Sequence, residues 1–437
     1  MSRALITDLY ELTMAYAYFR EGKNEPATFD LFVRPPVAHR RFLLVAGVDA
    51  ALDYLENLYF AAEDLQYLED LGIFDAEFLD YLTKFRFTGE VLGFPEGAIA
   101  FPGEPLLRVT APRIEAQIVE TYLLNAVNHQ TLIASKAARI LLAAGANAML
   151  VDFSPRRDPG EEASLKVARA AYLAGFNATS NLEASRIYGI PPSGTMAHSY
   201  VMSHDDELEA FRSFARHYYR PLLLIDTYDT LNGAENALTV ARELAQEGRE
   251  VLGVRLDSGN LVELSRQVRA KFDRAGFPNI KIFISGDLDE YRILDFQNQG
   301  GSAWGYGIGT RLGISADSPA LAGVYKLVHD SRGPQIKKSP GKVTLPGRKQ
   351  VWRKAGYHDT LGLEGESLPG TPVLQALMRE GKRLAPPQDL HKLREQVRHT
   401  LLGLPPELAL VQSEPNPTYP VQLSTALAEV LTSLSGQ

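Results

Sequence analysis

Short apolar runs alternate with longer amphipathic segments through the middle of the chain. The runs are rich in Val, Ile and Leu, which is typical of strands buried on both faces. The longer segments repeat apolar residues every three or four positions, which is typical of helices that cover a sheet. The alternation, about thirty residues per unit, predicts a parallel α/β sheet, either open or closed into a barrel. The predicted strands lie in AMLVDF (148–153), PLLLIDTYD (221–229), EVLGVRLDSG (250–259), IKIFISGD (280–287) and WGYGIGT (304–310).

The two flanks of this region have a different character. The first 130 residues or so mix helical segments with β-like ones such as PATFDLFVR (26–34), and the chain beyond about residue 330 is rich in Pro, Gly and Lys before it becomes helical. No internal repeat appears beyond the strand–helix alternation. We therefore expect residues 1–130 and 331–437 to form one discontinuous domain beside a barrel of residues 131–330.

Composition excludes several classes of protein. The absence of cysteine rules out disulfides, thiolate zinc sites and cysteine nucleophiles. A net charge of −8 gives no support to nucleic-acid binding. No apolar run is long enough to cross a bilayer, and Asp8 and Glu11 interrupt the N-terminal segment where a signal peptide needs apolar residues. We expect a folded, cytoplasmic protein with no membrane partner.

Polar residues suited to chemistry cluster at the predicted strand ends. In a parallel α/β barrel, the C-terminal rim of the strands is where active sites are built. Several residues at the same level of the sheet therefore predict one site there. They are Asp152, His198, Asp226, Asp257, Asp287 and the pair Gly307 and Gly309.

Two of these segments suit phosphate. GYGIGTRL (305–312) has glycines that allow backbone N–H groups to approach an anion, and Arg311 adds charge. The alternative is a strand whose glycines relieve packing. FSPRRDPG (153–160) presents Arg156 and Arg157 for bidentate contacts, and its alternative is a solvated basic turn.

The remaining candidates each have a structural alternative. Asp257 and Asp287 suit ribose hydroxyls or a phosphate-bound Mg²⁺, but each lies where a helix N-cap is also expected. Asp226 could orient His198, whose small neighbours also suit a merely structural histidine. Tyr10, in TDLYELTM, either follows a helix cap or stacks on a flat ring.

Taken together, the motifs of the chain resemble the nicotinate phosphoribosyltransferase family. They occur in family order from residue 7 to about residue 353, some four-fifths of the chain. The matching segments are TDLYELTM, QTLIASKAAR, FSPRR, GTMAHS, DTYDTL, GVRLDSG, ISGDLDE, GIGTRL, VYKLV and GRKQVWR.

The resemblance implies a type II phosphoribosyltransferase fold, with an α/β sandwich domain from both flanks and an irregular parallel (β/α) barrel. It implies the reaction of nicotinate with 5-phosphoribosyl 1-diphosphate to nicotinate mononucleotide and pyrophosphate, an entry step to NAD. ATP hydrolysis would drive it through a phosphohistidine, and Mg²⁺ would accompany the diphosphate without a dedicated protein site. It also implies a homodimer with shared sites.

The resemblance further implies a role for each site residue. His198 would be phosphorylated by ATP and oriented by Asp226. The pyridine ring would lie between Phe153 and a Tyr10 of the partner subunit, near Ser180 and Arg156. The phosphoribosyl unit would be held by Arg255, Asp257, Gly286 and Asp287, and its 5-phosphate by Gly307, Gly309 and Thr310.

The chain departs from common family forms at two places. FSPRRDPG replaces the more usual FGLRRAQG, and Asn260 replaces the last acid of LDSGD. The alternatives within the fold are nicotinamide phosphoribosyltransferase and, because the chain is longer and lacks an RKT motif, less readily quinolinate phosphoribosyltransferase. The alternatives outside the family are a phosphosugar isomerase or aldolase and a degenerate barrel that only binds ligands. An aldolase would need a Schiff-base lysine at a strand end, and residues 148–310 offer none.

Overall fold

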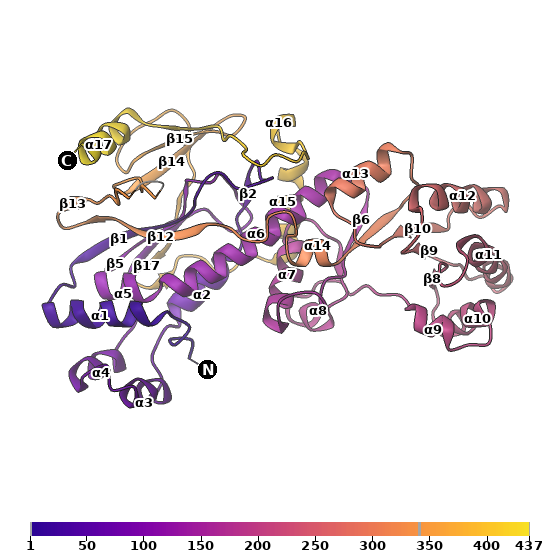
Figure 1. Ribbon diagram of the computed structural model, residues 1–437, viewed down its shortest axis with the longest axis horizontal. Coiled ribbons are helices and arrows are strands. Elements are labelled where there is room, and N and C mark those ends of the chain that lie inside the picture. Colours follow the sequence, from indigo (N-terminus) through magenta and orange to yellow (C-terminus); the bar gives the residue numbers. More distant parts are fainter. Residues whose placement is uncertain (1, 340–341, 437) are drawn as a thin grey trace. The chain divides into compact units, whose positions relative to one another are not determined.

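The computed structural model describes residues 2–339 and 342–436 and divides into two compact units (Figure 1). The first unit contains the chain up to residue 135, residues 318–393 and the chain from residue 413. The second contains residues 136–317 and 394–412. Two predicted boundaries differ from these units. Residues 318–330 belong to the first unit, and residues 394–412 return to the second.

The first unit is built on an antiparallel sheet with the order β13-β12-β1-β5-β3-β17-β18 among the described residues. The β-like segments of both flanks meet here, because β1 pairs with β5 on one side and with β12 on the other. This pairing is why the strand at 323–330 leaves the predicted barrel. The strands are β1 (Pro26–Val33), β3 (Glu90–Gly93), β5 (Pro105–Pro112), β12 (Gly323–Asp330), β13 (Gly333–Pro334), β17 (Gln375–Arg379) and β18 (Lys382–Arg383).

Smaller sheets and helices complete the first unit. Helix faces pack apolar residues into its core, where Phe78, Leu82 and Leu107 are fully buried. The smaller sheets are β2 (Leu43–Leu44) with β4 (Ile99–Ala100), and β16 (Thr371–Pro372), β14 (Lys349–Lys354), β15 (His358–Leu363) and β19 (Val421–Leu423). The helices are α1 (Leu9–Glu21), α2 (Val48–Glu56), α3 (Ala62–Asp70), α4 (Ala76–Thr83), α5 (Arg113–Ile118) and α17 (Thr425–Ser435).

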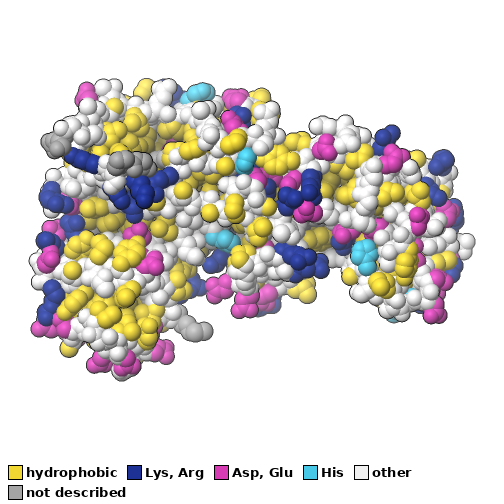
Figure 2. All heavy atoms as spheres, viewed as in Figure 1, with side chains coloured by type: hydrophobic (Ala, Val, Ile, Leu, Met, Phe, Trp, Pro, Cys, Tyr) yellow, Lys and Arg dark blue, Asp and Glu magenta, His cyan; other side chains and the backbone are white. Residues whose placement is uncertain are grey.

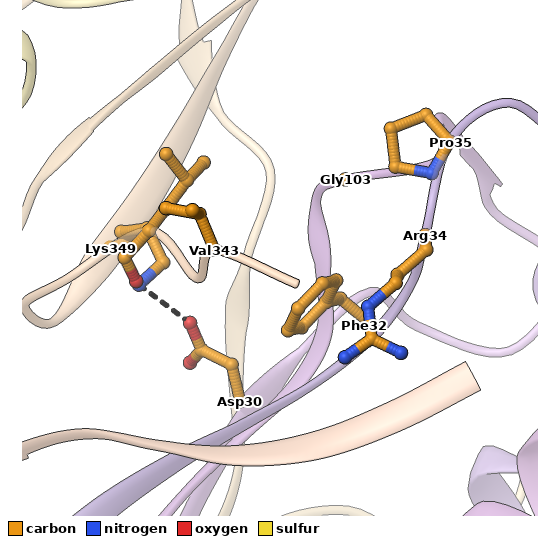
Figure 3. Close-up of a pocket in the computed structure, with 8 residues that line it drawn as sticks. Asp30, Phe32, Arg34, Pro35, Gly103, Val343 and Lys349 are labelled. Atoms are coloured by element: carbon orange, nitrogen blue, oxygen red, sulfur yellow. Dashed lines mark hydrogen bonds and ion pairs between the residues drawn. The ribbon is translucent and has the colours of Figure 1, made fainter. Parts of the chain in front are cut away.

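A pocket of about 320 Å³ lies beside the first unit's main sheet (Figure 3). Asp30 and Phe32, alternate residues of β1, line it together with Arg34, which directly follows the strand. Asp30 forms a buried ion pair of 2.8 Å with Lys349. The residues that line this pocket include none of the predicted site residues, which directs attention to the second unit.

The second unit contains the predicted parallel sheet. Its order is β7-β6-β11-β10-β9-β8, every neighbouring pair is parallel, and β7 and β8 form its two edges among the described residues. The sheet is therefore a curled half-barrel rather than a closed one, and the α/β prediction is confirmed. The strands are β6 (Met149–Asp152), β7 (Ala178–Thr179), β8 (Leu222–Leu224), β9 (Gly253–Leu256), β10 (Lys281–Ile284) and β11 (Gly305–Ile308).

Helices follow most of these strands, in the predicted alternation. Two others, α6 (Glu120–Ala144) and α15 (Leu390–Leu402), cross the boundary between the units in sequence. The helices within the second unit are α7 (Glu161–Leu173), α8 (Leu182–Tyr188), α9 (His198–Met202), α10 (Glu207–His217), α11 (Thr230–Gln246), α12 (Leu261–Arg274), α13 (Glu290–Asn298), α14 (Thr310–Gly313) and α16 (Pro406–Ala409).

Two further features of the described structure are its surface charge and the length of its helices. Acidic and basic side chains are interspersed over the face shown in Figure 2. Within the described residues, no helix combines the length and apolar character needed to span a membrane.

Candidate active site

The C-terminal ends of β8 and β9 bring two predicted carboxylates together. Asp226, just after β8, is buried, and its Oδ2 accepts hydrogen bonds from the backbone N–H of Asp257 at 2.9 Å and from the Ser258 hydroxyl at 2.7 Å. These contacts arise because β8 and β9 are parallel and in register, with Leu224 opposite Arg255. The other oxygen, Oδ1 of Asp226, is buried with no hydrogen-bond partner in the described part of the chain.

Arg255 is the centre of the site. Its Nε donates to Ser285 at 2.7 Å and its Nη2 to Asp257 Oδ1 at 2.6 Å, so it links β9 with β10. Its guanidinium lies 5.3 Å from the centre of the Phe153 ring, which follows β6. Burial alone would raise the pKa of Asp257, but the Ser285 hydroxyl and the charges of Arg255 and His198 outweigh it and lower that pKa. The structure therefore presents an ionised carboxylate, an arginine and an aromatic face together.

His198 has a different partner from the predicted one. Its Nδ1 lies 3.1 Å from the Thr227 hydroxyl, and Asp226 makes its contacts with Asp257 and Ser258 instead. The predicted Asp226–His198 pair is not formed in this structure. His198 is also not at a strand end but begins α9, and the segment before it contributes only an isolated bridge between Pro192 and Thr179.

Side-chain hydrogen bonds fix the loop that follows β6. Asp152 accepts from the Ser154 hydroxyl at 2.6 Å and from the Thr179 hydroxyl at 2.8 Å, so the ends of β6 and β7 are joined. Ser154 also donates to Asp158 at 3.0 Å. Burial, with the nearby charge of Asp152, raises the pKa of Asp158 to about 6.

Two predicted residues lie on these strand-end loops without strong side-chain contacts. Arg156 is exposed and forms no ion pair with a described residue, so it is available to an anion. Ser180 follows β7 and is half-buried, and its backbone N–H donates to Asp152 O at 2.9 Å.

The N-caps of α12 and α13 are residues two or three positions later in the sequence than Asp257 and Asp287. Asn260 caps α12 by accepting from Glu263 N at 3.2 Å, and Asp289 caps α13 by accepting from Arg292 N at 2.9 Å. The alternative that Asp257 or Asp287 serves as the cap is therefore wrong. Asn260 thus fills the N-cap of α12, a role that the more usual acid would fill equally well, since Asn and Asp are both favoured there.

Two of the three predicted glycines at this rim sit where a side chain would collide. Gly286 has φ +104°, and a Cβ there would lie 2.2 Å from Asp257 O. A Cβ on Gly307 would lie 2.4 Å from the Phe153 ring. Gly309 precedes α14, which begins at Thr310, and has ordinary space around its Cα. Glycine at these two positions thus lets the Asp257 backbone and the Phe153 ring pack directly against the ends of β10 and β11.

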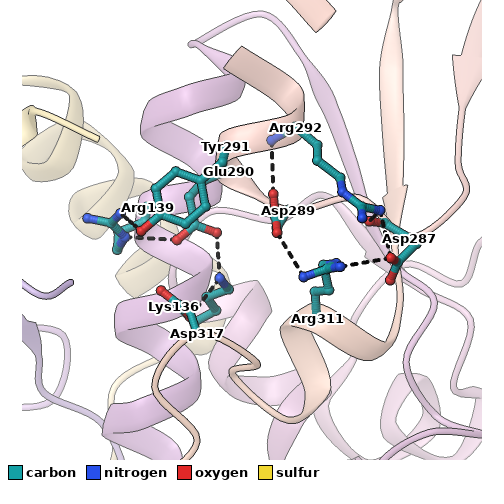
Figure 4. A network of polar contacts seen from close by, with 9 residues as sticks. All are labelled: Lys136, Arg139, Asp287, Asp289, Glu290, Tyr291, Arg292, Arg311 and Asp317. Atoms are coloured by element: carbon teal, nitrogen blue, oxygen red, sulfur yellow. Dashed lines mark hydrogen bonds and ion pairs between the residues drawn. The ribbon is translucent and has the colours of Figure 1, made fainter. Parts of the chain in front are cut away.

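Asp287 and Arg311 are joined at this rim (Figure 4). Arg311 Nη2 donates to Asp287 Oδ2 at 2.9 Å, and Arg292 donates to the same oxygen at 2.6 Å. Burial would raise the pKa of Asp287, but the hydrogen bond from Arg311 and the charges of both arginines lower it. Arg311 is therefore an ion-pair partner in this structure, not the unpaired phosphate ligand that the sequence suggested.

Tyr10 belongs to the first unit. It lies on α1 with 45% of its surface exposed, and burial of its hydroxyl end, together with Glu120 and Glu11, raises its pKa. Its place relative to the site remains a prediction.

Sequence reasoning missed Thr227 and the roles of Ser285, Arg292 and Asp158. Thr227 and Ser285 lie beside predicted strand-end residues and could have been found by the same rule. Arg292, on α13, and Asp158, after β6, make contacts with loop residues, and the sequence carries no periodic signal for how those loops fold. In the part of the chain that the structure describes, no three His, Asp or Glu side chains are grouped as a metal site.

The second unit is an α/β half-barrel whose polar residues gather at one rim of a curled parallel sheet, and the first unit is a discontinuous one built on an antiparallel sheet. Residues 5–128 match the nicotinate phosphoribosyltransferase N-terminal domain and residues 148–328 the nicotinate phosphoribosyltransferase family. The chain belongs to the nicotinate phosphoribosyltransferase family, and the recognition from its motifs is confirmed.

Individual relatives agree with this assignment. The chain is 45% identical to nicotinate phosphoribosyltransferase PncB2 of Mycobacterium tuberculosis over 99% of this chain and 94% of that one. It is 43% identical to nicotinate phosphoribosyltransferase of Bacillus subtilis over 80% of this chain and 73% of that one. The crystal structure of human nicotinic acid phosphoribosyltransferase superposes with a TM-score of 0.85 at 29% identity, covering 98% of this chain and 99% of the human one.

Proposed function

We propose that this protein transfers the phosphoribosyl group of 5-phosphoribosyl 1-diphosphate to the ring nitrogen of nicotinate. The C–O bond between ribose C1 and the diphosphate breaks, and a C–N bond forms at the same carbon. The products are nicotinate mononucleotide and pyrophosphate. ATP hydrolysis accompanies the reaction and yields ADP and phosphate.

The observation that carries the proposal is the Arg255 cluster. One guanidinium joins Asp257 and Ser285 and lies over the Phe153 ring, so a flat ring and a charged sugar phosphate can be held side by side. This cluster lies within residues 148–328, the range that matches the family. The relatives named for this activity extend over nearly the whole chain.

The geometry suits a reaction that develops positive charge at ribose C1. As pyrophosphate leaves, an oxocarbenium-like centre forms, and ionised Asp257 stabilises it while Arg255 and the exposed Arg156 stabilise the negative charge of the departing pyrophosphate. Nicotinate itself is the nucleophile, so the protein supplies positioning rather than a covalent nucleophile. Phe153 provides one face for the pyridine ring, with Ser180 beside it. Gly286, Asp287, Gly307, Gly309 and Thr310 supply the ribose and 5-phosphate contacts.

ATP coupling is assigned to His198. When Nδ1–H donates to Thr227, the lone pair of the imidazole lies on Nε2, which makes Nε2 the nitrogen that attacks the γ-phosphorus. ADP leaves, and water later cleaves the phosphohistidine. Mg²⁺ would enter with the substrate phosphates and neutralise their charge. The orphaned Oδ1 of Asp226 fits a water molecule of the hydrated ion, which favours that arrangement.

Tyr10 is proposed to complete the pyridine site from a partner subunit. Its ring is half-exposed on α1, which leaves a face for stacking. Equal amounts of Tyr10→Ala and His198→Ala proteins, mixed and allowed to exchange subunits, should recover roughly a quarter of the ATP-stimulated activity of wild type, because half of the dimers then carry one intact site. No regain would place both residues in one subunit's site.

The test of the reaction is mononucleotide formation with 5-phosphoribosyl 1-diphosphate and Mg²⁺. Nicotinate, nicotinamide and quinolinate are supplied separately, with and without ATP. We expect product from nicotinate, faster with ATP, and loss of that stimulation in His198→Ala. His204→Gln is the matched control, since the side chain of His204 contacts Tyr200, through its carbonyl and its ring, and the Ser203 hydroxyl, and none of these contacts is with a predicted site residue. Product from nicotinamide alone would favour the sister activity, and no product from any base would favour a binding protein.

A further inference from the structure

Arg311 connects the loops that follow two neighbouring strands. It lies one residue into α14, directly after β11, and its guanidinium reaches Asp287 in the loop after β10 at 2.9 Å. Its other terminal nitrogen lies 3.3 Å from Asp289 in the same loop. A single planar side chain thus bridges two carboxylates, a geometry that the forked guanidinium suits and an ammonium does not.

Asp287 needs such support because its backbone is in an unfavourable region. It has φ +52°, which a residue other than glycine rarely adopts, and it follows Gly286 at φ +104°. Arg292 donates to the Asp287 carbonyl and to its carboxylate, each at 2.6 Å. Arg292 lies on α13, the helix that follows the Asp287 loop in sequence, so among the described residues it is Arg311 that ties that carboxylate to the segment after β11.

The far end of the bridge is firmly anchored (Figure 4). Asp289 caps α13, and the next residue, Glu290, is fully buried between Lys136 at 2.6 Å and Arg139 at 2.9 Å on α6. Asp317 also contacts Lys136, at 2.8 Å. The start of α13 is therefore a rigid point against which Arg311 can hold the β11 loop.

We propose that Arg311 is a positioning residue for the phosphoribosyl substrate: it fixes the Asp287 carboxylate relative to the Gly309–Thr310 backbone through its bridge to Asp289. The inference rests on the proposed function, in which these two loops hold the ribose and the 5-phosphate. The spacing between the loops then selects a ribose that carries a 5-phosphate. Nicotinate does not contact this bridge, so its binding is independent of Arg311.

The experiment compares Arg311→Gln with Asp289→Asn and with the double variant. Asn at 289 keeps the cap of α13 but removes the charge, so it tests the bridge alone. Binding of 5-phosphoribosyl 1-diphosphate is measured by calorimetry, and KM and kcat are measured for both substrates. Loss of a charge-assisted contact predicts that Kd for 5-phosphoribosyl 1-diphosphate rises about 10-fold in Arg311→Gln. The nicotinate KM should stay within about twofold of wild type, since that contact is not with the base.

The double-mutant cycle of Arg311→Gln and Asp289→Asn, together with two further variants, tests whether the loss comes from the bridge itself. The double variant should be no weaker than Arg311→Gln alone, because both changes break one bridge. Arg311→Lys should give a partial loss, and it replaces Arg311→Gln if the latter does not fold. The control is Arg266→Gln, an exposed arginine of α12 with a 4.0 Å ion pair, and it should bind normally.

Several outcomes would overturn the inference. These are unchanged binding of 5-phosphoribosyl 1-diphosphate in Arg311→Gln, an equal loss for nicotinate, or fully additive losses in the double variant. If the wild type makes no mononucleotide but still binds 5-phosphoribosyl 1-diphosphate, the proposed reaction fails while the calorimetry still decides the role of Arg311. If the wild type does not bind it, both proposals are refuted.

Discussion

Replacing Gly307 by alanine tests whether the Phe153 ring is held in place by the neighbouring strand. Gly307 lies in β11, and an added Cβ would lie 2.4 Å from two ring atoms of Phe153 and 3.0 Å from Phe283. Its φ is not in the left-handed region, so the effect of the substitution is steric. The flexible partner is the Phe153 ring, which is only half-buried and follows the end of β6.

The magnitude follows from the distances. Ordinary carbon–carbon contacts begin near 3.5 Å, so the ring must move by about 1 Å. Overpacking of this kind costs about 1–3 kcal/mol, which in a unit of roughly 200 residues lowers Tm by about 5 °C. The ring also lies 5.3 Å from the Arg255 guanidinium, so its displacement disturbs the face proposed for nicotinate. We expect the nicotinate KM to rise about 10-fold, with a smaller change for 5-phosphoribosyl 1-diphosphate.

Thermal unfolding and steady-state kinetics with both substrates check this prediction. Phe153→Leu in the Gly307→Ala background should restore Tm without restoring the nicotinate KM. Gly194→Ala is the matched control, because a Cβ there meets open space and its φ is unexceptional. An unchanged Tm and an unchanged nicotinate KM would refute the steric reasoning. A rise in KM for 5-phosphoribosyl 1-diphosphate alone would show that Gly307 acts through its backbone instead.

Three further predictions follow from buried charges. Lys136→Met leaves the buried Glu290 with Arg139 as its cation and should destabilise the protein by about 3 kcal/mol, measured by denaturant unfolding. Burial raises the pKa of Glu11 to about 7, so the folded state holds its proton more tightly and stability falls as pH rises from about 4.5 to about 7. The Tm of Glu11→Gln minus that of wild type should therefore be more positive at pH 8 than at pH 5. An equal difference at both pH values would contradict this prediction. Burial also raises the pKa of Asp158 to about 6, so its contribution to stability likewise falls as pH rises. Asp158→Asn should therefore flatten the fall in Tm between pH 4 and pH 6.

The sequence alone was sufficient for five of the six described strands of the half-barrel, all but the short β7, and for most of the residues at its rim. Strand and helix periodicity is local, and parallel strands end at one rim, so Asp226, Arg255, Asp257 and Asp287 could be placed there in advance. The ordered motifs were specific enough to identify the family. None of these inferences required knowing which strands are neighbours.

Tertiary structure alone decided the pairings. β12 joins the first sheet because β1 offers it an antiparallel partner, and residues 394–412 return to the second unit, neither of which has a local signal. His198 meets Thr227 rather than Asp226, because Asp226 is taken by the N–H and hydroxyl of the next strand's loop. Arg311 likewise pairs with Asp287 and Asp289, because the fold brings these carboxylates next to it. Which polar group satisfies which depends on distances set by packing between segments far apart in sequence, and residue patterns do not encode those distances.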